Sequence, residues 1–196
     1  MEQENTSSNN RDFIISCALT LFAQRGYDAV SVREITEMAK ISKPTLYHYF
    51  GSKEGLLKIV ISEKFTPFLS LLEIASNYSG DLPNSLEKVV DVYINFAEIN
   101  PICYRLLLTL ENPPTQSDVH EVALPFLTRQ YQLFENLFER AAENHGNMVG
   151  RKQLYAMGFL SLIHSVISRY YLSKEEHIPD QIKYDIIRQF SYGIYS

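Results

Sequence analysis

An all-α fold is the prediction for this chain of 196 residues, and three observations lead to it. Apolar residues recur at helical spacing along most of the sequence. The alternating pattern and hairpin turns that mark strands are absent, and no internal repeat occurs. Turn-forming residues divide the chain into about nine segments of helical length. We therefore expect a protein built from about nine helices.

Two short helices in the first quarter of the chain carry clear start signals, and a third precedes them. The first spans about residues 11–25, with apolar positions three or four apart and Gly26 as a left-handed stop. The second covers residues 31–39, where Ser31 and Glu34 form a capping box. The third follows Ser42, with Pro44 in its first turn, and ends near residue 50.

Six further helices are expected in the remainder. The next one starts after Ser52, and we expect Pro67 to kink or end it. Five more helices are expected after it, over about residues 84–99, 100–110, 118–144, 150–172 and 180–195. The loops are expected at residues 77–83 and 112–117, and Pro125 is a second kink position.

Composition restricts the class of protein. The formal net charge is −5, so the chain as a whole is no polycation, and basic regions must be sought locally. Cys17 and Cys103 stand alone, which argues against a disulfide framework or a metal site and suits a reducing cytosol. Residues 1–10 are polar and lack the features of a signal peptide, and no run of apolar residues could span a membrane. We expect a soluble, cytoplasmic protein without cofactor or metal.

The segment 31–53 has the spacing of a helix-turn-helix, because only residues 39–42 join its two helices. On the second helix Leu46 and Phe50 share the inward face, whereas His48 points away from it. Pro44 and Thr45 flank His48, and Tyr47 and Tyr49 lie at the two borders. In this motif the second helix enters the major groove of DNA.

Local charge agrees with a DNA-binding face. Arg33, Lys40, Lys43 and Lys53 outnumber Glu34 and Glu37 in this segment, although the whole chain is acidic. A basic patch on an acidic protein directs DNA to one surface.

The same region closely resembles the TetR family of transcriptional regulators. The resemblance lies in Phe22-Ala23-Gln24-Arg25-Gly26-Tyr27, in Val32-Arg33-Glu34-Ile35, and in the run from Ser42 to Leu56, SKPTLYHYFGSKEGL, and it covers about residues 11–60. It implies an all-α homodimer with an N-terminal DNA-binding domain and a variable C-terminal ligand-binding domain. The expected division is a disordered tail at 1–10, a helix-turn-helix domain at 11–55, and a ligand-binding and dimerisation domain at 56–196.

The resemblance also assigns residues to DNA. It implies that six residues of the helix-turn-helix face DNA: Ser42, Pro44, Thr45, Tyr47, His48 and Lys53. We add the neighbouring Lys43 and Tyr49 to this set. Arg33 is expected to reach a phosphate. Relatives often have glycine at position 44, and Pro44 removes one backbone donor. The alternatives are packing roles for Tyr47 and Tyr49, and solvated surface roles for Arg33, His48 and Lys53.

The helical body holds many large apolar side chains that either line a ligand cavity or form ordinary core. The candidate ligand-binding residues are Tyr93, Phe96, Cys103, Tyr104, Leu107, Phe126, Phe134, Tyr155, Phe159 and His164. A second set forms stripes on the last two helices, and either mediates a dimer or closes the subunit's own core. The candidate dimerisation residues are Val166, Tyr170, Ile182, Ile186, Phe190 and Ile194.

Together these features predict a sequence-specific DNA-binding regulator. We expect a homodimeric repressor that a small, mostly apolar effector releases from a pseudo-palindromic double-stranded operator. An activator or a protein-partner adaptor of the same fold is the alternative. An enzyme is disfavoured, because the sequence has no Ser/His/Asp set, no His-Glu-x-x-His and no glycine-rich phosphate loop.

Overall fold

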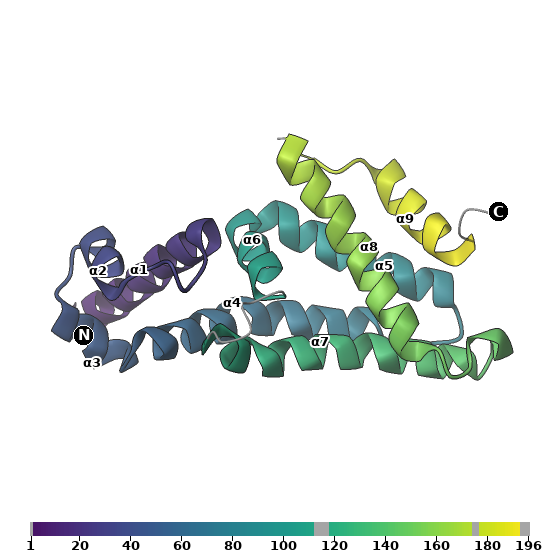
Figure 1. Ribbon diagram of the computed structural model, residues 1–196, viewed down its shortest axis with the longest axis horizontal. Helices are drawn as coiled ribbons and strands as arrows, with labels where there is room; N and C mark the ends of the chain where they lie inside the picture. The colour runs from purple at the N-terminus through teal and green to yellow at the C-terminus, as the bar shows by residue number, and fades with distance from the viewer. Residues whose placement is uncertain (1, 112–117, 174–176, 193–196) are drawn as a thin grey trace. The chain divides into compact units, whose positions relative to one another are not determined.

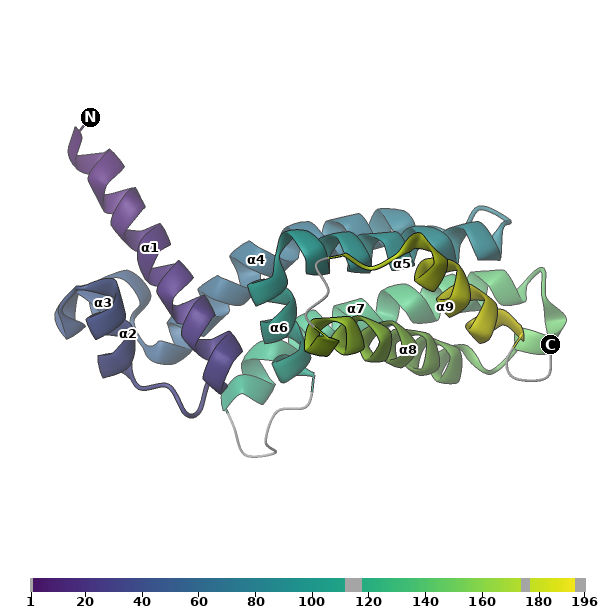
Figure 2. The same ribbon diagram turned by 90° about the horizontal axis from the view of Figure 1, so that it is seen from above.

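The computed structural model describes residues 2–111, 118–173 and 177–192, and all regular structure within these ranges is helical (Figures 1 and 2). The prediction of an all-α chain with about nine helices is confirmed there. The helices are α1 Glu2–Arg25, α2 Val32–Ala39, α3 Lys43–Phe50, α4 Lys53–Ala75, α5 Leu82–Ile99, α6 Pro101–Leu110, α7 Asp118–Ala142, α8 Lys152–Ser173 and α9 Asp180–Tyr192, with a 3₁₀ turn at Gly146–Met148. The second predicted loop, at 112–117, lies outside the described residues.

The chain forms two compact units, each made of separate stretches of sequence. One comprises Met1–Thr66 and Ile102–Phe126, and the other Pro67–Pro101 and Leu127–Ser196. Two of the boundaries fall at Pro67 and Pro101, and the third comes just after Pro125. The residue ranges of the two units therefore differ from the domain boundary expected at residue 55.

In the first unit α1 packs against α2, and α2 against α3 (Figure 1). Ile14, Ala18 and Phe22 of α1 are fully buried, as the apolar face of that helix predicts. α1 begins at Glu2 rather than at Arg11. No glycine or proline interrupts the chain before Gly26, so helical geometry can continue through the polar segment that we expected to be a tail.

The corner between α3 and α4 is tight. Gly51 has a positive φ of 72°, and the Ser52 hydroxyl accepts a hydrogen bond of 2.9 Å from the N–H of Gly55. A Cβ atom on Gly55 would lie 2.1 Å from the carbonyl oxygen of Phe50. Because that distance is far below van der Waals contact, only glycine allows α4 to start directly behind α3.

The expectation that Pro67 could end its helix is wrong, because α4 continues through it to Ala75. Proline removes one hydrogen bond to the preceding turn, but Pro67 is exposed and water can reach the freed carbonyl. Beyond it, Phe68 and Leu72 are buried, and their burial favours continuing the helix.

The second unit has an aromatic core, and α9 lies against both α5 and α8 (Figures 1 and 2). Tyr93, Phe134 and Phe159 are completely buried, and Phe138 is 1 % exposed. α5 begins at Leu82, because the side chain of Asp81 and not that of Asn84 caps it, accepting from the Asn84 N–H at 3.0 Å. Across the described residues, none of the helices combines the length and apolarity needed to cross a bilayer.

Candidate nucleic-acid interface

The turn between α2 and α3 takes only three residues. Lys40 ends α2 in the left-handed conformation, with φ 54° and ψ 43°, and its N–H points at the Thr36 and Glu37 carbonyls. The N–H of Ile41 donates to the Thr36 carbonyl at 3.0 Å. Ser42 then caps α3 by accepting from the Thr45 N–H at 3.3 Å. These bonds hold the two helices in a helix-turn-helix arrangement.

α3 has one buried and one exposed face. Leu46 is fully buried and Phe50 is 8 % exposed, so both anchor the helix in the first unit. Tyr47 is 46 % exposed, and His48 is exposed next to it. Both side chains are accessible on the second helix of a helix-turn-helix, which makes this face a candidate DNA-contact surface.

The remaining residues of α3 extend that face. Lys43 and Pro44 are exposed, as is the capping residue Ser42. Thr45 and Tyr49 are half-buried. The Thr45 hydroxyl lies 2.8 Å from that of Ser42, and the Tyr49 ring lies 5.6 Å from that of His48 and 5.9 Å from that of Phe50. Thr45 and Tyr49 are therefore partly engaged within the protein.

The start of α2 is held by the predicted capping box. The Ser31 hydroxyl accepts from the Glu34 N–H, and the Glu34 carboxylate accepts from the Ser31 N–H at 2.8 Å. Arg25, which sequence reasoning did not single out, donates to the other carboxylate oxygen of Glu34. The hydrogen bonds from Ser31 and then the Arg25 contact lower the pKa of Glu34 to about 2.

Arg33 points into solvent at the start of α2. Its guanidinium forms an ion pair of 2.7 Å with Glu37 one turn later, and the two side chains are 75 % and 60 % exposed. The contact with Glu37 raises the pKa of Arg33. Since an exposed pair of this kind contributes little to stability, Arg33 can exchange Glu37 for a phosphate at small cost.

Lys53 lies differently from the other candidates. Its Nζ donates to the backbone carbonyls of Tyr27 and Val30 at 2.9 and 2.8 Å, and lies 3.9 Å from the centre of the Tyr27 ring. Burial lowers the pKa of Lys53 and raises that of Tyr27 to about 12. The ammonium joins the start of α4 to the loop before α2, and the contact of Lys53 with DNA stays a prediction.

The predicted ligand-binding residues form packed core in both units. In the second unit Tyr93 receives a hydrogen bond of 2.7 Å from Gln130 and packs edge-on against His164. Phe96 stacks on Phe68, and rings also meet around Phe134, Phe159 and Tyr155. In the first unit Cys103, Tyr104, Leu107 and Phe126 are buried. Neither of the two pockets described in the second unit is lined by any of the ten.

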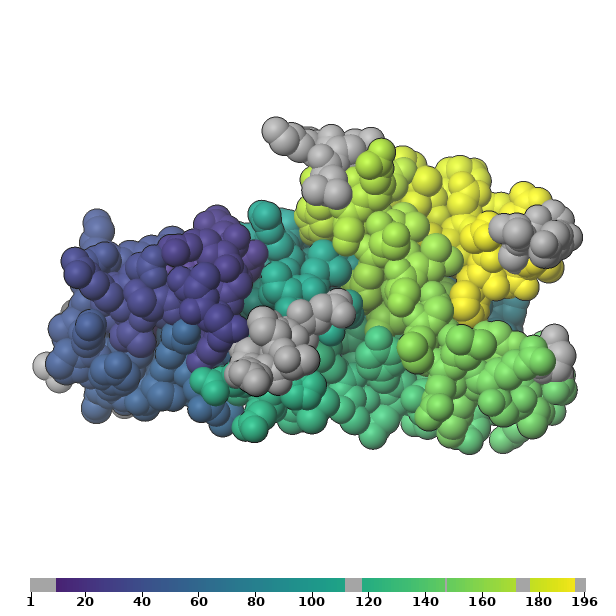
Figure 3. Space-filling model, viewed as in Figure 1, coloured from purple at the N-terminus to yellow at the C-terminus, as the bar shows by residue number. Residues whose placement is uncertain are grey.

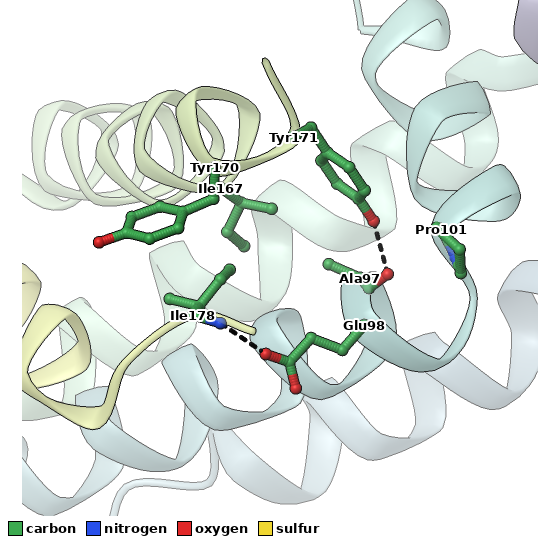
Figure 4. Close-up of a pocket in the computed structure, with 7 residues that line it drawn as sticks. All are labelled: Ala97, Glu98, Pro101, Ile167, Tyr170, Tyr171 and Ile178. Carbon is green, nitrogen blue, oxygen red and sulfur yellow. Dashed lines mark hydrogen bonds between the residues drawn. The ribbon is translucent and has the colours of Figure 1, made fainter. Parts of the chain in front are cut away.

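One of those pockets, of about 240 Å³, lies where α5 and α8 end and the segment before α9 begins (Figure 4). Its walls are Ala97, Pro101, Ile167 and Ile178, together with the rings of Tyr170 and Tyr171 and the carboxylate of Glu98. The Tyr171 hydroxyl donates to the Ala97 carbonyl at 2.5 Å. Glu98 Oε1 accepts from the Ile178 N–H at 2.8 Å and lies 2.8 Å from His177 Nδ1. Of these residues only Tyr170 was singled out from the sequence, and as a dimer residue.

The predicted dimerisation residues are largely engaged within their own subunit. Ile186 is 2 % exposed. The Phe190 ring lies 4.8 Å from Phe159 and 5.7 Å from Phe138. Val166, Tyr170 and Ile182 are half-buried, and Ile194 lies outside the described residues.

Other apolar side chains on these two helices are exposed. On α8 they are Leu154 and Met157, at 67 % and 55 %, and on α9 Tyr184 and Tyr192, at 59 % and 69 %. α8 and α9 lie next to each other on the face shown in Figure 3. The apolar stripes alone did not distinguish the side chains that close the core from those that remain accessible.

Comparison with known proteins agrees with this architecture. Residues 14–60 match the family model described as bacterial regulatory proteins of the tetR family. The transcriptional activator FasR of Mycolicibacterium smegmatis is 27% identical over 184 residues, which are 93% of this chain and 81% of FasR. The transcriptional repressor BdcR of Escherichia coli is 53% identical over 49 residues, but that match covers only 25% of each protein.

Solved structures resemble nearly the whole chain. PfmR of Thermus thermophilus, a TetR-family regulator, has a TM-score of 0.73 at 20% identity, and the match covers 94% of this chain and 96% of PfmR. FadR of Bacillus subtilis, solved in complex with stearoyl-CoA, has a TM-score of 0.74 at 16% identity and matches over 93% of this chain and 98% of FadR. At such identities these likenesses concern the fold.

An all-α chain with a helix-turn-helix whose second helix is exposed belongs to the class of helix-turn-helix transcriptional regulators. Within that class residues 14–60 match the TetR family, as the resemblance of residues 11–60 predicts, and a solved TetR-family structure shares the fold of nearly the whole chain. FasR and BdcR are both described as transcriptional regulators.

Proposed function

We propose that this chain is a homodimeric repressor that binds a pseudo-palindromic operator through α3 and is released by a small, mostly apolar effector. The exposed face of α3 carries the proposal, since Tyr47 and His48 stand in solvent on a helix anchored by Leu46 and Phe50. Aromatic and imidazole groups on a recognition helix contact base edges and thymine methyl groups.

DNA contacts are proposed in two groups. Pro44, Thr45, Tyr47 and His48 read bases, with Tyr49 at the border of the face. Ser42, Lys43 and Arg33 contact the phosphate backbone, where a hydroxyl, an ammonium and a guanidinium are the usual donors. The exposed positions of Lys43 and Arg33 support this assignment.

The test is binding-site selection followed by titration of variants against the selected operator. Tyr47→Ala and His48→Ala should each weaken binding by about 1–3 kcal/mol if the side chains make full base contacts. Leu71→Ala, which truncates a similarly exposed apolar side chain of α4, is the control and should bind the operator normally. Unchanged affinity in the Tyr47/His48 double variant would remove the basis of the proposal.

A dimer follows from the geometry of operators. Two recognition helices enter successive major grooves only when they lie about 34–36 Å apart, so a two-fold dimer reads a pseudo-palindrome. We propose that the accessible apolar side chains of α8 and α9, Leu154, Met157, Tyr184 and Tyr192, form the interface, with Val166, Tyr170 and Ile182 at its edge. Their exposure supports this, because isolated subunits seldom leave so many large apolar groups in water.

Release by an apolar effector is supported by the aromatic content of the helical body and by the relative that was solved with stearoyl-CoA. The effector must bind the DNA-free state more tightly than the DNA-bound state, because equal affinities shift no population. Operator DNA must then weaken effector binding by the same factor. Calorimetric titration of an effector with and without operator tests this, and identical affinities would exclude allosteric release.

The sign of regulation has one specific alternative. FasR, which matches most of the chain, is an activator, whereas BdcR, which matches over 49 residues, is a repressor. A promoter reporter containing the selected operator distinguishes the two. Lower output in the presence of the protein supports the repressor, and higher output supports an activator with the same DNA-binding face.

A further inference from the structure

We propose that the pocket of about 240 Å³ bounded by Glu98 and Tyr171 binds a small organic cation, a primary amine joined to one aromatic ring (Figure 4). Binding at this pocket stands apart from DNA recognition, and it involves none of the residues that we predicted to bind an effector. The pocket lies wholly within the second unit.

The size of the pocket limits the ligand. A protein cavity of about 150 Å³ accommodates benzene. A volume of about 240 Å³ therefore holds one aromatic ring and a chain of two or three further atoms. The aliphatic side chains of Ile167 and Ile178 and the rings of Tyr170 and Tyr171 provide the apolar walls that such a ring requires.

Charge determines the other end of the ligand. Among the described residues that line the pocket, Glu98 is the one with a charged side chain. Its Oε1 is engaged by the Ile178 N–H and by His177, whereas its Oε2 has no hydrogen-bond or ionic partner among the described residues. The Glu98 side chain is 24 % exposed, so this oxygen sits beside apolar walls with limited access to water. An ammonium group satisfies it, while a carboxylate ligand is repelled.

The tyrosines favour the same cation. The rings of Tyr170 and Tyr171 form part of the pocket wall. Aromatic faces also attract ammonium groups through the ring quadrupole. In Figure 4 the Tyr171 hydroxyl meets the Ala97 carbonyl, while the Glu98 carboxylate extends toward Ile178.

The probes are 2-phenylethylamine and two matched analogues, the neutral 2-phenylethanol and the anionic 3-phenylpropionate. Calorimetric titration of the full chain at pH 7 should give binding of the amine at least tenfold tighter than of the alcohol, and none of the carboxylate. Amide chemical shifts of Ala97, Glu98 and Ile178 should move during the amine titration, which locates the ligand.

Glu98→Gln is the decisive variant, because the amide oxygen still accepts from the Ile178 N–H while the charge is removed. It should weaken amine binding at least tenfold and leave binding of the alcohol unchanged. His177→Ala removes the imidazole that contacts Glu98 Oε1, and it should not weaken binding of the amine. Glu87→Gln, at an exposed carboxylate of the same helix, is the control and should behave as the unmodified chain.

Equal affinities for amine and alcohol, an unaffected Glu98→Gln variant, or absence of amine binding would each overturn the proposal. Shifts confined to residues away from the pocket would do the same. Operator binding by the same preparations, measured without any amine, shows whether the DNA-binding function holds, so the two proposals fail separately.

Discussion

Among the described residues, Lys40 is the only residue other than glycine with a positive φ, 54°. The left-handed conformation brings Cβ close to the neighbouring carbonyl oxygen, and glycine avoids that contact. Sequence reasoning counted Lys40 only as a basic residue. The shortness of the turn was a signal, because a chain that reverses between two helices within three residues needs one left-handed position.

Lys40→Gly is expected to stabilise the protein by about 0.5–1 kcal/mol, since relief of the strained backbone exceeds the added freedom of the unfolded chain. Thermal unfolding should show a rise in Tm of about 1–4 °C. Lys43→Gly, a change inside α3, is the matched control and should lower Tm, because glycine disfavours helix at an unstrained position. A fall in Tm for Lys40→Gly would show that the turn is not strained.

Lys53 shows what residue-level inference from a motif leaves out. Its position in the sequence suggested a phosphate contact, but the direction of a long side chain at a helix start depends on which acceptors lie within reach. Here the backbone carbonyls of Tyr27 and Val30 lie within reach of the Lys53 ammonium. Their position depends on the path of the loop before α2, which the local pattern does not reveal.

Lys53→Met is expected to lower the free energy of unfolding by about 1–3 kcal/mol, because two carbonyls lose a charged donor. The salt dependence of operator binding should remain the same. Lys43→Met should do the opposite, with unchanged stability and a logarithmic salt slope smaller by about one unit. If Lys53→Met keeps its stability and lowers the slope, Lys53 turns to a phosphate when DNA binds.

At the scale of helices, the ends of α2 and α3 were predictable because their signals are local. Ser31, Glu34 and Ser42 lie within three residues of the amide groups that they cap. The passage of α4 through Pro67 was not predictable, since burial of Phe68 and Leu72 against other helices outweighs one lost hydrogen bond.

The capping box makes the start of α2 sensitive to acid. The pKa of Glu34, about 2, lies below its ordinary value of 4.5, so the carboxylate contributes stability above pH 4.5 that is lost as pH falls toward 2. Glu34→Gln should therefore show a smaller loss of stability between pH 5 and about 2.5 than the unmodified chain. Denaturant midpoints across this range measure the difference, and parallel curves would contradict the assignment. Glu37→Gln, which removes an exposed ion pair with Arg33, is the control.

At the scale of the whole molecule, the all-α class and the family were readable from the sequence, whereas the roles of the apolar side chains were not. A stripe such as Ile182, Ile186 and Phe190 identifies a buried face of α9 but not the surface that covers it. In the structure Phe159 and Phe138 cover Phe190 within the same chain. Likewise Tyr93 and Phe134 belong to the core, and the pocket beside Glu98 is lined mainly by residues with no distinctive sequence pattern.

The dimer prediction is tested at exposed positions. Met157→Lys combined with Tyr184→Lys should give a folded monomer that no longer binds the operator, because lysine at an apolar interface remains without a partner. Sedimentation velocity measures the assembly state, and circular dichroism verifies the fold. Val149→Lys, which changes an equally exposed residue outside both helices, should remain dimeric.

Lysine at Ile186 or Phe190 should instead unfold the subunit, since both side chains pack within it. A dimeric Met157/Tyr184 variant would place the interface on another surface of the chain.

The division of the chain also bears on how such regulators can be recombined. The unit that contains α3 is not a continuous cassette, because Met1–Thr66 folds together with Ile102–Phe126. A hybrid gene with one crossover near residue 66 would inherit these two stretches from different parents and mismatch their shared core. Exchange of both stretches keeps the core intact. New operator specificity is therefore easier to introduce by substitutions on α3 than by transplanting the N-terminal third of the chain.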